Sequence, residues 1–293
     1  MPLSHLLLCL SIAMTLLPVT APWPWLATLI MAVTAGQVNG QLGIAALAPI
    51  GALAALAWMT IAAAGRPRRE LALMLLMLVL GLALSLHLLP GFLNPTYLVS
   101  ASDQRAPTLK YLNFDKGVAG LLMLAVMATQ QRRVRVASAT ALSRLAQRTG
   151  TPPWALPAVI VATLAVPWLL AVASGIGQPT LRWPDNAGLF LTANLFLTCV
   201  AEEAAFRGVV QGLLARRLGT DLRTARGWLP VLVAALLFGA AHAAGGIAYV
   251  GLATLAGLGY GLAYALTRRI EVAIGLHVAL NALVFTTLNL RVG

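Results

Sequence analysis

Three polar patterns interrupt long apolar segments in the second half of the chain. Their members, in sequence order, are Glu202, Glu203 and Arg207, then Phe238 and His242, then His277 and Asn281. Each pattern contains two side chains four residues apart, which therefore lie on one face of a helix: Glu203 and Arg207, Phe238 and His242, and His277 and Asn281. An ionisable group at the centre of a membrane span costs roughly 2.5–3.5 kcal/mol on insertion scales, so such groups indicate a functional site.

A carboxylate and two imidazoles can hold a water molecule and remove its proton. Glu202 is the candidate general base. The side chains of His and Asn can donate hydrogen bonds to the oxyanion that forms when water attacks a peptide carbonyl. Alternatively, Glu202, His242 and His277 could be three ligands of a divalent metal such as zinc, with water in the open position. Both arrangements predict hydrolysis, and the need for a metal stays open.

Buried polar side chains also have other uses. They could form hydrogen bonds between helices or a proton relay in a transporter. Glu203 and Arg207 can pair across one helix turn, which favours a structural ion pair over a catalytic dyad. His87 has no partner at helical spacing and is predicted to pack at the interface or within the bundle, whereas His5 is predicted to be solvated.

The composition predicts the elements that must position these side chains. Of the 293 residues, 60% are hydrophobic and only 10% are charged, whereas about a quarter are charged in a typical soluble protein. We therefore expect an all-α, polytopic membrane helix bundle with about eight to ten transmembrane helices, each needing about 20 apolar residues. The apolar segments are 3–20, 24–37, 43–64, 71–89, 117–130, 155–174, 187–213, 228–244, 247–267 and 272–290.

The formal net charge of +12 comes from 20 basic and 8 acidic residues. From Arg66 onward, arginines cluster in every second loop between the apolar segments. This alternation is typical of a threaded membrane protein whose basic loops face the cytoplasm. It accounts for the charge without a nucleic-acid partner. The first apolar segment lacks a basic start, so we expect a membrane helix there rather than a cleaved leader.

One basic, threonine-rich segment divides the chain. It ends in Thr151-Pro152-Pro153, which is a poor continuation for any helix. We predict N-terminal membrane helices of unknown role at 1–130, a basic cytoplasmic linker at 131–154, and a helical core that carries all three polar patterns at 155–293.

In this order, and on separate apolar segments, the three patterns resemble the motifs of the CPBP family, also called the ABI family. EExxxR begins at Glu202, FxxxH at Phe238 and HxxxN at His277. The family comprises CAAX-type prenyl-protein endopeptidases and bacteriocin-processing enzymes. The resemblance covers about residues 155–293 and implies that this part is a CPBP/ABI-like intramembrane protease core.

The resemblance also implies roles for the individual residues. Glu202 and His242 would activate the water, and His277 and Asn281 would form the oxyanion hole. Glu203, Arg207 and Phe238 would support the site. The implied substrate is a membrane-associated or lipidated protein, cut near a terminus as in CAAX, sorting-tail or leader processing. The implied location is the plasma membrane of a bacterium or archaeon. The alternatives are a non-catalytic binding or immunity protein and a proton-coupled transporter.

Such a site requires the side chains of Glu202, His242 and His277 to converge within about 8 Å. In a straight, fully spanning helix with a rise of about 1.5 Å per residue, His242 would lie about 10 Å from the others in depth. We therefore expect the helix before His242 to be short or tilted, to begin near Thr224, and to be followed by a turn at Gly245-Gly246.

Overall fold

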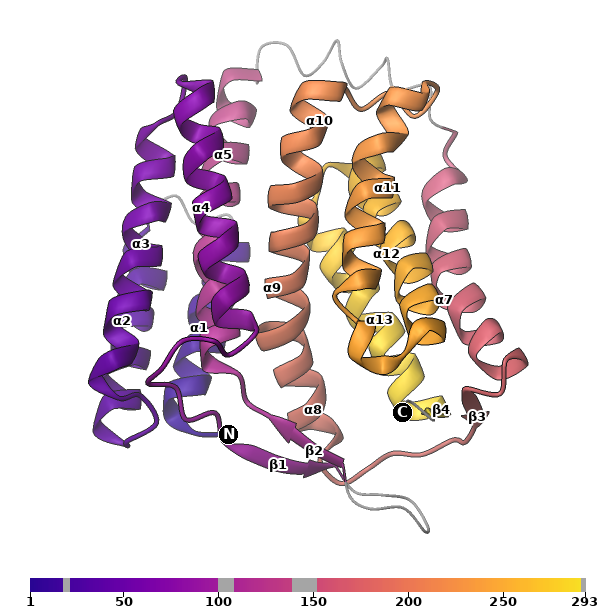
Figure 1. Ribbon diagram of the computed structural model, residues 1–293, viewed down its shortest axis with the longest axis horizontal. Coiled ribbons are helices and arrows are strands. Elements are labelled where there is room, and N and C mark those ends of the chain that lie inside the picture. The colour runs from indigo at the N-terminus through magenta and orange to yellow at the C-terminus, as the bar shows by residue number, and fades with distance from the viewer. Residues whose placement is uncertain (18–21, 100–107, 139–151, 291–293) are drawn as a thin grey trace. The chain divides into compact units, whose positions relative to one another are not determined.

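The computed structural model describes residues 1–17, 22–99, 108–138 and 152–290, and most of them are helical (Figure 1). Each predicted apolar segment coincides with a helix, which confirms the all-α prediction. The helices are α1 (Leu3–Leu16), α2 (Trp23–Val38), α3 (Leu47–Ala62), α4 (Pro67–Ser85), α5 (Phe114–Ser138), α7 (Ala155–Ala173), the continuous run α8 to α10 (Ala187–Leu218), α11 (Ala225–Ala240), α12 (Ile247–Thr267) and α13 (Ile270–Thr287).

Several of these helices can cross a membrane. Among the described residues, five helical segments are both long and apolar enough: Ile44–Ala62, Ala155–Ala173, Ala187–Leu218, Ile247–Thr267 and Ile270–Thr287. The helices α1 and α11 are apolar but shorter. The chain is therefore a polytopic membrane bundle, as predicted, while the number of eight to ten spans stays a prediction.

Two short antiparallel sheets accompany the helices. β1 (Thr96–Val99) pairs with β2 (Thr108–Tyr111), and β3 (Gly177–Pro179) pairs with β4 (Leu288–Leu290). The apolar pattern does not predict these strands, because each has only three or four residues. The first sheet lies between α4 and α5 in the chain, so it leads directly into the first turn of α5.

Contacts divide the chain into two units. The first comprises Met1–Ala139 and Asp185–Ala205, and the second comprises Thr140–Pro184 and Phe206–Gly293. The structure thus groups residues 185–205 with the N-terminal helices, whereas the sequence-based division assigns them to the core at 155–293. The predicted linker at 131–154 falls mostly on residues 139–151, which lie outside the described part of the chain.

The central helix of the first unit is α5. It contacts α1, α3, α4 and the short helix α9 (Val200–Glu203), and its residues 117–127 are all buried. A helix that is apolar on every side is stable only when neighbours surround it. Gly120 sits at the contact with α9, where an added Cβ would lie 2.7 Å from Cα of Ala201. The missing side chain lets the two helices approach closely.

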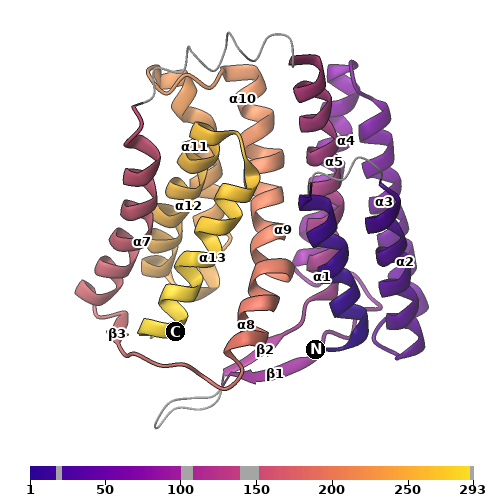
Figure 2. The ribbon, with the colours of Figure 1, turned by 180° about the vertical axis from the view of Figure 1, so that it is seen from behind.

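The central helix of the second unit is α12, which packs against α7, α11 and α13 (Figure 2). Its close contacts depend on glycine in the same way. A Cβ on Gly259 would clash with the side chain of Thr163 in α7, and a Cβ on Gly239 in α11 would clash with Thr254 of α12. Small residues are typical of helix interfaces within membranes, where tight packing drives association.

We expect Gly120→Ala to destabilise the protein, because the new methyl group must push α5 away from α9. Overpacking of this kind costs about 1–3 kcal/mol. The measurement is thermal unfolding of the purified protein in detergent. Gly51→Ala in α3 is the matched control, since a Cβ there meets nothing within 4 Å. Equal stability of the two variants would contradict the close α5–α9 contact.

Candidate functional site

Glu202 and Glu203 lie in α9, between two π-helical segments of the same helical run. These are η2 (Asn194–Cys199) and η3 (Ala204–Gln211). π-Helical turns are rare and occur frequently at functional sites. They also change which side chains face each other, so the α-helical spacing assumed for Glu203 and Arg207 does not apply here. The predicted ion pair between these two residues stays a prediction.

Glu202 has a basic partner from the N-terminal part of the chain. Nζ of Lys116, in the first turn of α5, lies 2.7 Å from Oε1 of Glu202. The two side chains are 16% and 15% exposed. The sequence offers only a weak signal for this contact, because Lys116 directly precedes an apolar segment and looks like an ordinary loop charge.

Asp115, the residue before Lys116, is held by a network of hydrogen bonds. Oδ2 of Asp115, which is almost fully buried, lies 2.7 Å from Nδ1 of His87. Oδ1 accepts hydrogen bonds from Nδ2 of Asn94 and from the amide of Lys116. Because a carboxylate oxygen only accepts, Nδ1 of His87 carries the proton. His87 has no partner at helical spacing because its partner, Asp115, lies on another helix.

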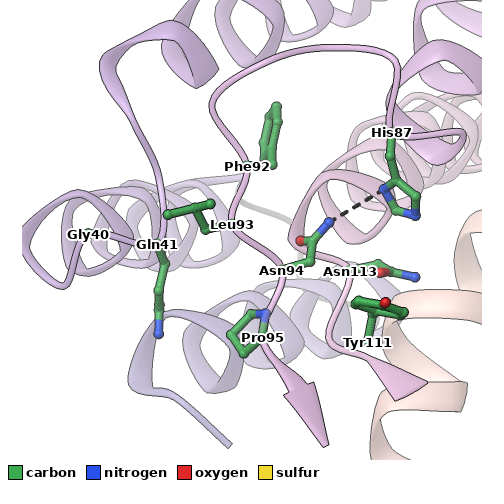
Figure 3. A pocket seen from close by; sticks show the side chains of 9 residues that line it. All are labelled: Gly40, Gln41, His87, Phe92, Leu93, Asn94, Pro95, Tyr111 and Asn113. Atoms are coloured by element: carbon green, nitrogen blue, oxygen red, sulfur yellow. Dashed lines mark hydrogen bonds between the residues drawn. The ribbon is translucent and has the colours of Figure 1, made fainter. Parts of the chain in front are cut away.

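His87 and Asn94 also border an open pocket of about 570 Å³, together with Tyr111 and Asn113 (Figure 3). In this view the side chain of Asn94 points toward His87, and Nδ2 of Asn94 lies 3.4 Å from Nδ1 of His87. Oδ1 of Asn94 accepts a hydrogen bond from the amide of Phe114. Asn94 thus holds the beginning of α5 through hydrogen bonds to two successive residues, Phe114 and Asp115.

His5 packs beside the same turn and is fully buried. Its Nε2 lies 3.0 Å from the carbonyl oxygen of Leu112, and its ring meets that of Phe114 edge-on at 5.3 Å. The prediction of a solvated His5 is therefore wrong. Position near the chain start suggested exposure, but the polar edge of the ring has backbone and Ser4 partners that make burial possible.

In the second unit, one aromatic ring connects the other two motifs. Phe238 of α11 is buried, and its ring lies 4.7 Å from that of His242 and 5.5 Å from that of His277. Tyr260 of α12 stacks on His277 with ring centroids 4.5 Å apart. Asn281 is half-buried one turn after His277 on α13. The sequence motifs do not include Tyr260, although it lies in the glycine-rich stretch of α12.

His242 lies just beyond the end of its helix. α11 begins after Thr224, whose side chain accepts a hydrogen bond from the amide of Gly227, and it ends at Ala240. The short helix and its start confirm the expectation. His242 itself is in the following turn rather than on the span, which corrects the assumption that each motif lies wholly within one helix. The chain then turns through Ala243–Gly245 and Gly246, whose φ is +85°.

The turn at His242 determines which nitrogen of its ring donates a hydrogen bond. Nδ1 lies 2.8 Å from the carbonyl oxygen of Phe238. A carbonyl oxygen only accepts, so Nδ1 carries the proton and donates it. In the neutral ring Nε2 is then an acceptor, able to receive a hydrogen bond from a water molecule. The side chain is half-buried, so this nitrogen can be reached.

Arg207 belongs to the same aromatic cluster. It is fully buried and donates a hydrogen bond of 2.7 Å from one guanidinium nitrogen to the carbonyl oxygen of Gly257. Its guanidinium carbon lies 4.7 Å from the ring centroid of Phe238 and 5.3 Å from that of Tyr260. A cation over aromatic faces is stabilised electrostatically. Arg207 therefore supports the rings that contact the two histidines.

The predicted residues thus fall into two groups. Glu202 and Glu203 belong to the first unit, and Arg207, Phe238, His242, His277 and Asn281 belong to the second. The second group is brought together through Phe238 and α13, while the convergence of Glu202 with His242 and His277 stays a prediction. Across the described residues, no three His, Cys, Asp or Glu side chains are arranged to hold a metal ion. No chemical step below passes through a metal.

The chain matches the family model of the type II CAAX prenyl endopeptidase Rce1-like proteins over residues 184–283. This range contains all three motifs, from Glu202 to Asn281, and leaves out the N-terminal helices. No curated protein and no solved structure matches the chain. The match supports a membrane-embedded peptidase of the CAAX type, acting on a protein substrate at the lipid bilayer. Over residues 184–283, about a third of its length, the chain is thus similar to the type II CAAX prenyl endopeptidases of the Rce1-like family.

Proposed function

We propose that this protein hydrolyses a peptide bond near one end of a membrane-associated or lipidated protein, using water activated by Glu202 and His242. The family match supports an endopeptidase of the CAAX type in general. The observation that carries the finer proposal is the contact of Phe238 with both His242 and His277, because it brings the second and third motifs to one place. Glu202 is proposed as the general base because it is the first residue of the first of the three motifs.

In the proposed reaction, Glu202 takes a proton from water as the oxygen attacks the peptide carbonyl. Nε2 of His242 accepts the second hydrogen bond of that water and orients it. The new C–O bond gives a tetrahedral oxyanion, which receives hydrogen bonds from His277 and Asn281. Glu202 then passes its proton to the amide nitrogen, and the C–N bond breaks. No residue forms a covalent bond to the substrate.

The surrounding side chains keep the reacting groups in place. Tyr260 stacks on His277, and Phe238 contacts the rings of both His277 and His242. Arg207 lies over the rings of Phe238 and Tyr260. Such packing limits the rotation of both histidines, and hydrogen-bond donors held in advance are worth more than mobile ones. Glu203 and Arg207 are therefore proposed as supporting residues rather than as catalytic ones.

The location of these residues supports a substrate that is anchored in the membrane. All of them lie on, or just beyond, apolar helices, and the surfaces of α7 and α11 expose large apolar side chains such as Leu169 and Leu236. Lipid is the natural neighbour of such surfaces. A substrate that is anchored in the bilayer by a lipid group or an apolar terminus can reach the helices from the side, whereas a soluble peptide cannot.

Glu202→Gln is expected to abolish processing while the protein stays folded, because the amide cannot accept the proton of water. Loss of a general base costs about 10²- to 10⁴-fold in rate. The measurement is terminal-peptide mass spectrometry on membranes from cells that lack the protein and are complemented with each variant. Glu271→Gln is the matched control, since Glu271 is a partly exposed carboxylate at the start of α13.

A peptide end that appears with wild type and Glu271→Gln, but not with Glu202→Gln, supports the proposal and identifies the cleaved bond. Identical peptide ends with wild type and Glu202→Gln, at equal expression, contradict it. Retention of the cellular function by Glu202→Gln would instead point to a non-catalytic binding protein.

Treatment with a chelator distinguishes activation of water by Glu202 and His242 from activation by a bound metal ion. We expect cleavage by the purified protein to continue after treatment with EDTA or 1,10-phenanthroline, because the proposed mechanism uses only Glu202 and His242. The measurement is the initial rate before and after chelation. A loss of activity that zinc restores would instead assign Glu202, His242 and His277 as metal ligands and replace the mechanism above.

A further inference from the structure

We propose that Lys116 is a positioning residue for Glu202, so that the first turn of α5 completes the peptidase site from outside the region that matches the family. The inference rests on the proposed role of Glu202 as general base. Nζ of Lys116 lies 2.7 Å from Oε1 of Glu202, and both side chains are largely buried. This contact assigns a function to N-terminal helices that carry none of the three motifs.

The ion pair lies in largely buried surroundings. A pair of opposite charges interacts more strongly in a low-dielectric interior than in water. An unpaired carboxylate in a membrane span is costly, and the contact of Nζ of Lys116 with Oε1 gives the Glu202 carboxylate a partner of opposite charge. Contact at one oxygen also fixes the rotation of the carboxylate group, and with it the direction of the second oxygen.

The backbone on which Lys116 is mounted is itself fixed. Asp115, with only 1% exposure, is bonded to His87, to Asn94 and to the amide of Lys116. Asn94 also accepts the hydrogen bond of the Phe114 amide. An acidic residue in the first helical turn is further favoured by the helix dipole. The network therefore prevents the first turn of α5 from fraying and places Nζ of Lys116 reproducibly.

The packing of α5 on α9 sets the register of the pair. Gly120 follows Lys116 by four residues, so the two positions share one face of α5. A Cβ on Gly120 would lie 2.7 Å from Cα of Ala201, the neighbour of Glu202. Close approach at Gly120 thus brings the two backbones together one turn away from the ion pair. Lys116 and Glu202 bridge the remaining space with their side chains.

The test is the rate of cleavage of a quenched fluorescent peptide with a farnesylated CAAX terminus, by purified protein in proteoliposomes. Lys116→Met removes the charge, Lys116→Gln keeps a hydrogen-bond donor, and Lys116→Arg keeps the cation. Misplacement of a catalytic group by about 1 Å can cost about 10²-fold. We therefore expect kcat to fall about 10- to 100-fold for Lys116→Met, less for Lys116→Gln, and at most about threefold for Lys116→Arg, with KM little changed.

The matched control is Lys110→Met, which removes an exposed lysine from the adjacent strand β2 and should leave both constants unchanged. Melting temperatures identify variants that fail to fold, and Lys116→Arg remains informative if Lys116→Met does not fold. The proposal is overturned if Lys116→Met stays within threefold of wild type, or if a folded Lys116→Arg is as slow as Lys116→Met. Equal rates for wild type and Glu202→Gln would overturn the proposed function itself, whatever the lysine variants do.

Discussion

A charged group inside an apolar helix bundle must have a partner, and this requirement shapes each part of the described structure. Transfer of an unpaired charge out of water costs more free energy than the packing of one side chain returns. Glu202 contacts Lys116, Asp115 accepts from His87 and Asn94, and Arg207 donates to the carbonyl of Gly257. Each contact links segments that are far apart in the sequence. These polar contacts therefore also join helices that are distant in the sequence.

The two units meet this requirement in different ways. In the first unit, charged and amide side chains surround the beginning of α5, and the carboxylate of Glu202 is held by an ion pair. In the second unit, aromatic rings surround the polar groups: the guanidinium of Arg207 lies over Phe238, the rings of His242 and His277 contact Phe238, and His277 also stacks on Tyr260. The family match over residues 184–283 includes the aromatic cluster of the second unit, and of the first unit it includes only Asp185–Ala205.

The sequence predicts the helices well, because they depend on local patterns, whereas the roles of the motif residues stay predictions. Apolar runs reveal spans, and spacing reveals which residues share a helix face, as for His277 and Asn281 on α13. Contacts between distant segments leave no such pattern, so Lys116, Tyr260 and the partner of His87 could not be predicted. The sequence also does not predict two local changes of the backbone. The π-helical turns around Glu202 depend on packing. The helix end before His242 accompanies the hydrogen bond from His242 to the carbonyl of Phe238.

The central claim is that Glu202 acts on the same water molecule as His242, with His277 nearby. A crystal structure of the full chain grown in a lipidic mesophase would test it directly, by the distances from the Glu202 carboxylate to the two imidazole rings. The proposed site predicts that all three side chains converge within about 8 Å, the reach of one shared water and its donors. A separation of roughly twice that distance, or a His242 ring facing lipid, would contradict it.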